Sequence, residues 1–554
     1  MSATQQPAAA SAGQSPSSAH PRRTLARRLY AEPRHQIFIG VSLVVSAWAV
    51  FQNFGKLGTA PILADEPTYI DAGWAYVHGR VSSPGRYAGL AHTAAGNFEH
   101  PPLAKYLFGL AQWIAGSPDG LTASRAVSAS ATVAAGVLVA VWIGRAAGRW
   151  TGLLAGALLT VLPEPASGSF GRFNRFAMLD PVASFFMVLS VVLVWEWARR
   201  CGRSSWIFAT LTGICVGLAA GSKENGFLGA VGPVLLVVGL GCVRRQRSEI
   251  LTRCAQAVFA VAISVATFVA LYVPFGHPIA CIRYLIDFQS AQSEAGHLIG
   301  FAGQVSMNPP WWANLWFAGH DYGALLTVFL VVGALCALTL RRDLLTWWCA
   351  AALAAPFVFH CFIATVALGY YWVMWAPMFL VLAALGAAEL IRRVIAASSA
   401  QLTVPVALVA CVTVLAIPGG AAIAQSRTVA DIQPTGVQAL ANLMHTRDLT
   451  GSIVSAGIPD WQWSYYLPGV DVYPNVSAEA TTARLIVIST PQCRDVIDPS
   501  VRALADVNLA AGKIHEIYSD SAITAYAADA TASLSIPEAG QVAAEPVSKI
   551  TDGC

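Results

Sequence analysis

Apolar blocks of about 20 residues recur along most of this chain, and they restrict its fold more than any other feature. A helix of about 20 apolar residues crosses a ~30 Å hydrocarbon core, where only helices and closed barrels satisfy their own backbone groups. Only 12% of the 554 residues are charged, whereas about 25% is usual in soluble proteins. The sequence therefore predicts an all-α polytopic membrane protein.

The positions of the blocks and of the arginines between them predict a topology. The eleven predicted spans cover residues 37–55, 122–144, 150–166, 177–198, 206–221, 226–243, 254–275, 321–340, 344–366, 370–391 and 401–423. With a cytosolic N-terminus, every inner turn carries arginine, as the positive-inside rule requires. An odd number of spans then places the C-terminus outside. We expect a multi-pass protein of the cell membrane.

This topology divides the chain into three parts. Residues 1–36, rich in Ala, Ser, Pro and Arg, predict a disordered basic cytosolic arm. Residues 37–423 form the transmembrane domain, with external loops at 56–121 and 276–320. Residues 424–554 form a small external α/β domain.

Local periodicity predicts elements in the external parts. Residues 66–78 and 103–114 have the spacing of amphipathic helices that lie on the membrane and roof an external cavity. In the tail, residues 452–456 and 483–489 are typical of strands, and residues 437–446 are typical of a helix.

Asp65 and Glu66 are adjacent carboxylates at the outer end of the first predicted span. Ionisable groups at the edge of the hydrocarbon favour a functional role. A structural alternative is that Asp65 caps the following helix, whose first turn would contain Pro67. The pair could also hold a divalent ion, although no His/Cys ligand set accompanies it.

Basic residues occur on the outer side, where positive charge is normally depleted: Lys105, Arg172, Arg175 and Lys223. Arg172 and Arg175 are three residues apart, so on one helical turn they would face the same way. Such a cluster fits a phosphate at the membrane surface. The alternative is that these side chains reach lipid headgroups or pair with neighbouring carboxylates.

A carboxylate that deprotonates a hydroxyl, together with cations that bind a leaving phosphate, favours glycosyl transfer from a phosphate-linked donor. No strand-GxGxxG-helix unit is present for a nucleotide sugar, so we expect a lipid-linked donor. The net charge of +4 is small and its arginines end the apolar blocks, so no nucleic-acid partner is implied.

Three motifs resemble one known group. Ala64-Asp65-Glu66, Glu99-His100-Pro101-Pro102-Leu103-Ala104-Lys105 and Arg175-Phe176-Ala177-Met178-Leu179-Asp180-Pro181 are similar in order and spacing to motifs of the protein O-mannosyltransferases. These enzymes belong to the GT-C superfamily, whose members use lipid carriers. The resemblance covers about residues 37–395, and it implies a GT-C fold and a polyprenyl-phosphate-linked sugar donor.

The resemblance also implies roles for single residues. Asp65 would be the catalytic base, supported by Glu66, and Arg175 and Lys223 would bind the donor phosphate, together with Arg172 from the same outer cluster. The motif does not fix the role of its other residues, and we expect them to position the loop helix: His100, Pro101, Pro102, Lys105 and Asp180.

The acceptor stays open. The loop at 276–320 is too short for the large luminal insertion of the eukaryotic mannosyltransferases, and the small external tail also resembles bacterial relatives that modify lipid A or cell-wall polysaccharide. Protein, lipid and glycan acceptors are therefore all considered. A transporter or flippase is the main alternative function, but the charges lie at the outer edge and no inverted repeat is evident. A membrane scaffold without catalytic activity is the third.

Overall fold

The computed structural model describes most of the chain, namely residues 33–63, 65–80, 97–117, 120–163, 172–243, 247–296, 299–302, 304–397, 403–458, 460–473, 476, 479–489, 499–529 and 533–537. Residues 1–32 of the predicted basic arm lie outside these ranges. The chain divides into two units, Met1–Ala47 and Trp48–Cys554, and each is described by itself. The described part of the first unit is helical.

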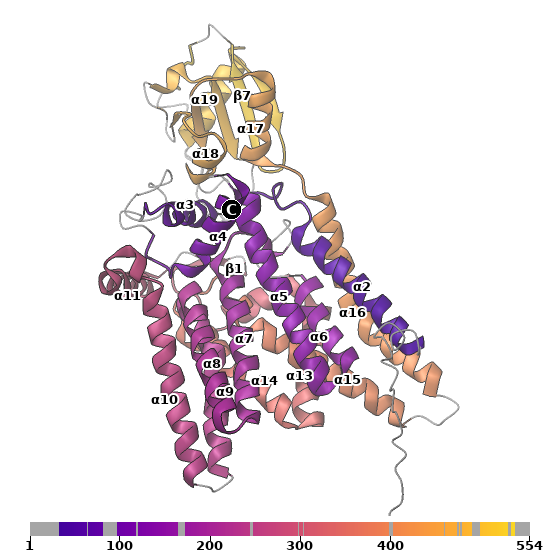
Figure 1. Cartoon of the computed structure of the whole chain (residues 1–554). Coiled ribbons are helices and arrows are strands. Elements are labelled where there is room, and N and C mark those ends of the chain that lie inside the picture. Colours follow the sequence, from indigo (N-terminus) through magenta and orange to yellow (C-terminus); the bar gives the residue numbers. More distant parts are fainter. Residues whose placement is uncertain are drawn as a thin grey trace, which may run out of the picture. The chain divides into compact units, whose positions relative to one another are not determined.

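The apolar part of the chain is helical, with the order shown in Figure 1. The long elements are α2 (Pro33–Phe54), α5 (Leu121–Ala147), α6 (Arg149–Val161), α7 (Leu179–Arg199), α8 (Gly202–Ser222), α9 (Leu228–Val243), α10 (Arg247–Ala270), α13 (Ala324–Cys336), α14 (Leu344–Val358), α15 (Ala376–Ala397) and α16 (Thr403–Asp431). Each predicted span overlaps one of these helices. Within the described residues, 7 helices are long and apolar enough to cross a membrane, so the multi-span class is confirmed. The count of eleven stays a prediction.

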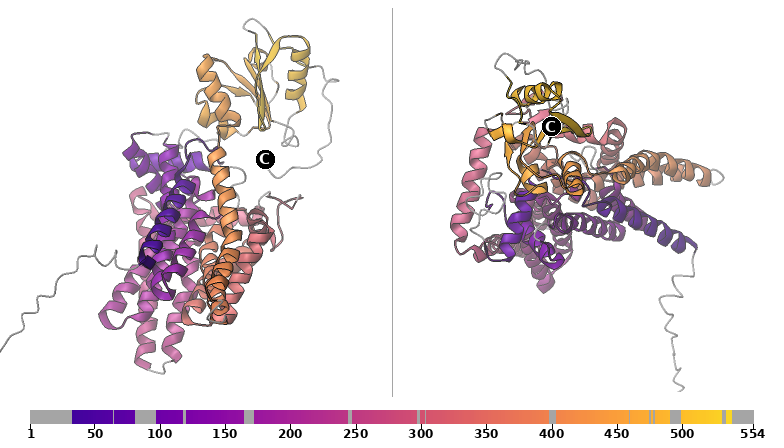
Figure 2. Two further views of the ribbon diagram at one scale, coloured as in Figure 1. Left: turned by 90° about the vertical axis from the view of Figure 1, so that its right-hand side faces the viewer. Right: turned by 90° about the horizontal axis from the view of Figure 1, so that it is seen from above.

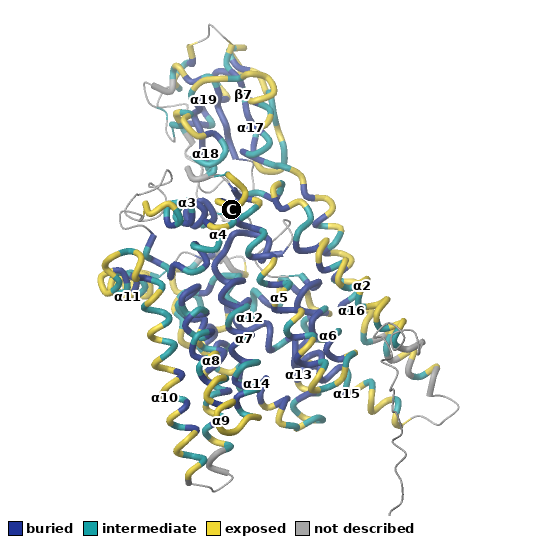
Figure 3. Tube along the Cα trace, viewed as in Figure 1, coloured by how far each residue is buried: buried dark blue, intermediate teal, exposed yellow. Residues whose placement is uncertain are grey.

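The helices differ in how much of their apolar surface other helices cover. In α7, 61% of the apolar stretch is buried, because α5, α8 and α9 pack around it. In α10 only 11% is buried, and Figure 3 shows exposed residues along most of this helix. Apolar side chains that no other helix covers suit contact with lipid. Helix α7 is thus a central element of the bundle, whereas α10 is peripheral.

The two predicted loop helices are confirmed as helices: α3 (Glu66–Val77) and α4 (Leu103–Ala115). They lie side by side in Figure 1 and contact each other extensively. Glycines allow this approach, because a Cβ on Gly109 would overlap the carbonyl of Gly73. The second predicted loop contains α11 (Pro278–Ala295), the hairpin β1 (Ile299–Phe301) and β2 (Gln304–Ser306), and α12 (Ala313–Tyr322).

The tail contains a five-stranded sheet in the order β4-β3-β5-β7-β6. The predicted strands are confirmed as β3 (Ile453–Ala456) and β5 (Leu485–Ser489), which pair in parallel, and β4 (Val472–Tyr473) extends the parallel side. The antiparallel side is β6 (Ile514–Ser519) and β7 (Ile523–Ala528). The helices are α17 (Gly436–Arg447), where one was predicted, α18 (Asp460–Tyr466) and α19 (Pro499–Ala510).

Helices α17 and α19 cover opposite faces of this sheet (Figure 2). The alternation of side chains along β5 accounts for this, since Leu485 and Val487 pack with α17 whereas Ile486 and Ile488 pack with α19. The predicted small α/β domain is present in the described residues.

Candidate functional site

Asp65 immediately precedes α3, and its side chain makes no capping hydrogen bond to that helix. The side chain is partly exposed. Burial raises the pKa of Tyr69, and three nearby carboxylates raise it further: Asp65, Asp180 and Glu224. Carboxylates from three separate segments thus lie around one tyrosine at the start of α3. The alternative that Asp65 caps this helix is not supported by a side-chain hydrogen bond to it.

Glu66 points away from solvent and has four hydrogen-bond donors around it. Arg125 donates from Nε to Oε1 at 2.8 Å and from Nη2 to Oε2 at 2.6 Å. The backbone N–H groups of Leu63 and Ala177 donate at 2.9 and 2.6 Å. Both partners of the ion pair are fully buried. Glu66 therefore joins the first motif to the third, and each of its oxygens accepts two hydrogen bonds.

Arg125 was missed by the sequence reasoning. Its remaining donors bind three carbonyls of the segment between α2 and α3, those of Leu57, Ala60 and Pro61, at 2.6, 2.7 and 2.8 Å. An arginine inside the outer turn of a predicted span was the signal that could have found it. Arg125 clamps the backbone that leads into Asp65.

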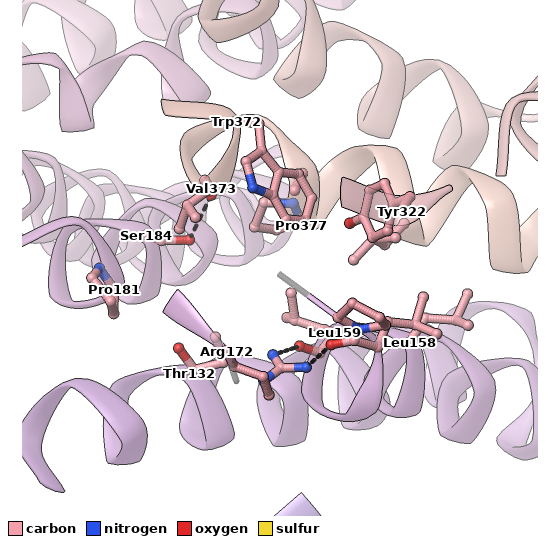
Figure 4. Close-up of a pocket in the computed structure, with 15 residues that line it drawn as sticks. Thr132, Leu158, Leu159, Arg172, Pro181, Ser184, Tyr322, Trp372, Val373 and Pro377 are labelled. Carbon is pink, nitrogen blue, oxygen red and sulfur yellow. Dashed lines mark hydrogen bonds between the residues drawn. The ribbon is translucent and has the colours of Figure 1, made fainter. Parts of the chain in front are cut away.

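Arg172 and Arg175, predicted to face one phosphate together, bind the ends of two different helices. Arg172 donates to the carbonyls of Leu159, at 2.9 Å, and Leu162 at the C-terminal end of α6 (Figure 4). Arg175 donates to the carbonyls of Gln52, at 2.8 Å, and Gly55 at the end of α2. Orphan carbonyls at a helix C-terminus are good partners for a cation.

The surroundings of the two arginines leave little space for a ligand. Both side chains are fully buried, and the cavity that Arg172 lines holds only about 20 Å³ (Figure 4). The sequence could not foresee these partners, because carbonyls at helix ends leave no signature in the side-chain pattern. Both arginines thus bind carbonyls at helix ends, and the phosphate role predicted for them stays a prediction.

Lys223 lies in a different environment. Its Nζ is 2.7 Å from Asp180 Oδ1 and lies over the rings of Tyr370 and Tyr371, 5.3 and 4.8 Å from their centroids. Asp180 Oδ2 is buried with no hydrogen-bond partner among the described residues. Asp180 was predicted to position a loop helix, and in the structure it forms this ion pair with Lys223. One carboxylate oxygen with no partner beside a lysine gives the pair unused hydrogen-bonding capacity.

The His-Pro-Pro motif forms the turn before α4, with Pro102 at its N-cap. Lys105, one turn into α4, donates to the carbonyl and side-chain oxygens of Asn97, the latter at 2.6 Å, and to the carbonyl of His100 at 2.8 Å. Burial lowers the pKa of Lys105 to about 7, although nearby carboxylates oppose this shift. These contacts join Lys105 to the turn that precedes α4, and its predicted positioning role stays a prediction.

His100 reaches from this turn to the 3₁₀ turn η4 (Glu224–Phe227), which precedes α9. Its Nδ1 lies 3.5 Å from Oε2 of Glu224, and its ring makes an edge contact with Tyr69 at 6.0 Å. The imidazole is 22% exposed, so a ligand can reach it. His100 and Lys223, from segments more than 100 residues apart, thus flank Glu224.

Two hollows meet at Glu224 and Phe268. The first is an apolar groove of about 560 Å³ between α8, α9 and α10, lined by Val231, Val261 and similar side chains. The second is a more polar cavity of about 670 Å³, lined by Asn225, Tyr371 and residues of α11 such as Gln289 and Ser290. A ligand with a long apolar chain and a polar head can therefore place its chain in the groove and its head in the cavity.

Comparisons with known proteins agree with this architecture. The family profile described as dolichyl-phosphate-mannose-protein mannosyltransferase matches residues 96–289, which include the second and third motifs. No curated protein sequence matches the chain significantly.

Solved structures of similar fold include two glycosyltransferases. ArnT from Cupriavidus metallidurans, bound to undecaprenyl phosphate, is 15% identical with a TM-score of 0.53, and the match covers 90% of this chain and 98% of ArnT. The oligosaccharyltransferase AglB from Archaeoglobus fulgidus, in complex with an inhibitory peptide and a dolichol-phosphate, is 14% identical with a TM-score of 0.51, over 90% of this chain and 75% of AglB. The chain thus has a fold similar to that of these two proteins, and its residues 96–289 are similar to the dolichyl-phosphate-mannose-protein mannosyltransferases.

Proposed function

We propose that this protein transfers a sugar from a polyprenyl-phosphate carrier to an acceptor hydroxyl on the outer face of the membrane. The junction of the apolar groove with the polar cavity at Glu224 and Phe268 carries this proposal. The polyprenyl chain lies in the groove beside α10, and the phosphate and sugar lie toward the polar cavity. The family profile, whose name includes a dolichyl-phosphate-linked mannose, supports the same donor class and favours mannose as the sugar.

Asp65 is the general base in this proposal. The acceptor O–H bond breaks and its proton moves to the Asp65 carboxylate, while the acceptor oxygen forms a bond to the anomeric carbon of the sugar. The bond from that carbon to the phosphate oxygen breaks, and its electron pair leaves with the polyprenyl phosphate. A positioned base contributes about 10²–10⁴-fold to such a rate.

Lys223 and His100 face the charge that develops on the leaving phosphate. Lys223 lies against Tyr371, which lines the polar cavity, and His100 is partly exposed beside Glu224. Cations and N–H donors placed where negative charge develops lower the barrier to its formation. We assign Arg172 and Arg175 to the scaffold because both donate to backbone carbonyls at helix ends.

In the proposed topology the N-terminus lies in the cytosol and the C-terminal domain lies outside. Arginines at the predicted inner turns support this orientation. A protein, lipid or glycan hydroxyl serves as acceptor, and mass spectrometry of glycans and glycoproteins from a deletion strain would identify which.

Blocking the groove tests the proposal. Val261 lines the groove, whereas Val258, one turn earlier on α10, does not and is 71% exposed. We expect Val261→Trp to weaken binding of decaprenyl phosphate to the purified protein in nanodiscs, and Val258→Trp to leave it unchanged. Equal affinities for the two variants and the wild type would show that the lipid binds elsewhere.

A further inference from the structure

Asn225 and His360 form a buried polar pair beside the polar cavity. Asn225 Nδ2 lies 3.3 Å from Nε2 of His360, and the two residues are 8% and 1% exposed. Asn225 lines the cavity, in the 3₁₀ turn η4 (Glu224–Phe227) that begins with a second lining residue. The pair joins segments 135 residues apart in the sequence.

The pair has unused hydrogen-bonding capacity. Asn225 Oδ1 and His360 Nδ1 are both buried without a partner among the described residues. Leaving a buried polar atom unsatisfied costs about 1–3 kcal/mol, so native proteins usually give such atoms a partner. Oδ1 belongs to a side chain that lines the cavity, so a ligand there is the natural partner.

The contact to His360 uses the nitrogen end of the Asn225 amide. With Nδ2 donating, Nε2 of the imidazole carries no proton, and the amide oxygen, a pure acceptor, is left to accept a hydrogen bond from a ligand. His360 itself is held in the π-helical turn η7 (Phe359–Ile363), where Asn314 Nδ2 donates to its carbonyl at 2.5 Å. Such π turns are frequent at functional sites.

The charged groups among the other described lining residues indicate which ligand charge the cavity accepts. The described lining contains the carboxylates of Glu224 and Glu294, amides and hydroxyls from α11, and no lysine or arginine. An anionic sugar would meet the two carboxylates of the lining, because the neighbouring cation, Lys223, is paired with Asp180 and is assigned to the phosphate. A neutral polyhydroxyl group would find many hydrogen-bond partners. The lining thus disfavours a uronic acid.

We propose that this cavity is the sugar subsite of the donor, that it takes a neutral monosaccharide, and that Asn225 accepts a hydrogen bond from a sugar hydroxyl. His360 is a positioning residue, because it acts through the amide of Asn225. This inference rests on the proposed function, in which the lipid tail lies in the adjacent groove.

Two families of probe separate the subsite from the lipid groove. The first is decaprenyl phosphate alone. The second is decaprenyl phosphate carrying mannose, glucose, galactose, arabinose or glucuronic acid. Affinities are measured on the purified full-length protein in nanodiscs. The gain in affinity that a sugar adds over decaprenyl phosphate reports on the subsite alone.

We expect Asn225→Leu, which keeps the size but removes the acceptor, to reduce the gain for the best neutral sugar about tenfold. Binding of decaprenyl phosphate stays at the wild-type level. His360→Gln, whose side-chain oxygen can still accept from Nδ2, keeps much of the gain, whereas His360→Phe loses it. Asn314→Leu is the control for packing, because Asn314 supports η7 without lining the cavity.

Other outcomes overturn the inference in distinguishable ways. If Asn225→Leu lost affinity equally for both probe families, the Asn225–His360 pair would have a structural role only. A wild-type protein that gains nothing from any sugar would have no sugar subsite, and one that prefers glucuronic acid would contradict the neutral ligand. Failure of the wild type to bind decaprenyl phosphate would contradict the proposed function itself.

Discussion

Two clusters of ionisable residues near the outer motifs differ in what their groups bind and in the space beside them. In the arginine cluster, Arg125, Arg172 and Arg175 bind Glu66 and backbone carbonyls around α2 and α6, and the adjoining cavity holds about 20 Å³. In the lysine cluster, Lys223 pairs with only one oxygen of Asp180, next to Tyr371 and the cavity of about 670 Å³.

The difference teaches that outer cations can have different partners although the sequence gives them the same position relative to the membrane. Arginine offers five donors in a fixed plane, which suits carbonyls at helix ends, whereas lysine presents a single point charge. In the proposed function the arginine cluster therefore builds the scaffold, and the ligand binds at the lysine cluster. Four predictions test this division.

The largest effect is expected from Asp65→Asn, because asparagine cannot take the acceptor proton. Turnover should fall by about 10²–10⁴-fold, while folding and donor binding persist. Single-turnover rates with a labelled donor measure this. Asp71→Asn, the same change farther along α3, serves as the matched control. A folded Asp65→Asn enzyme with near-normal turnover would restore the capping role, since asparagine is nearly as good an N-cap.

Breaking the arginine cluster should instead affect folding. Arg125→Met leaves the carboxylate of Glu66 buried without its ion-pair partner, and losing one partner of a buried pair typically costs about 3–5 kcal/mol. We expect a strongly lowered thermal midpoint in detergent and less folded protein. Where folded Arg125→Met protein is recovered, its affinity for decaprenyl phosphate should match the wild type. A variant with a normal midpoint but weak lipid binding would place Arg125 at the ligand.

Lys223 and Arg175 allow a direct contrast. Lys223→Met should weaken decaprenyl phosphate binding by about 10- to 100-fold, the usual range for a hydrogen bond to a charged group. Arg175→Met should lower stability without changing that affinity. Asp180→Asn is the control for the lysine, because it removes the competing carboxylate and should keep or tighten binding. Loss of affinity in Arg175→Met alone would return the phosphate to the arginine cluster.

The smallest expected effect concerns Lys105. The folded protein releases its proton near pH 7, whereas the unfolded chain holds it up to the usual pKa of 10.5. The unfolded state therefore binds more protons between these values, and the contribution of Lys105 to the unfolding free energy increases from pH 7 to 10.5. Thermal midpoints across this range should rise less in Lys105→Met than in the wild type. Parallel curves would show that Lys105 does not titrate there.

The sequence predicted those features that depend on local pattern. Hydropathy located the helices, and apolar spacing located α3 and α4 within a residue or two of their observed ends. Pairings between distant segments could not be read from it. Arg125 meets Glu66 across 59 residues, and Asn225 meets His360 across 135, and no periodicity encodes which segments become neighbours. Arg125 and His360 also lie inside apolar stretches, where a single polar residue draws little attention.

The exposed flank of α10 has a kinetic consequence. Because Val261 and Val265 line the groove and are 61% and 57% exposed, a donor can enter sideways from the bilayer without passing through water. The enzyme then encounters its donor by two-dimensional diffusion, and saturation depends on the mole fraction of donor among the surrounding lipids. Diluting the donor with inert lipid at constant bulk concentration slows the reaction, whereas adding water to the suspension does not.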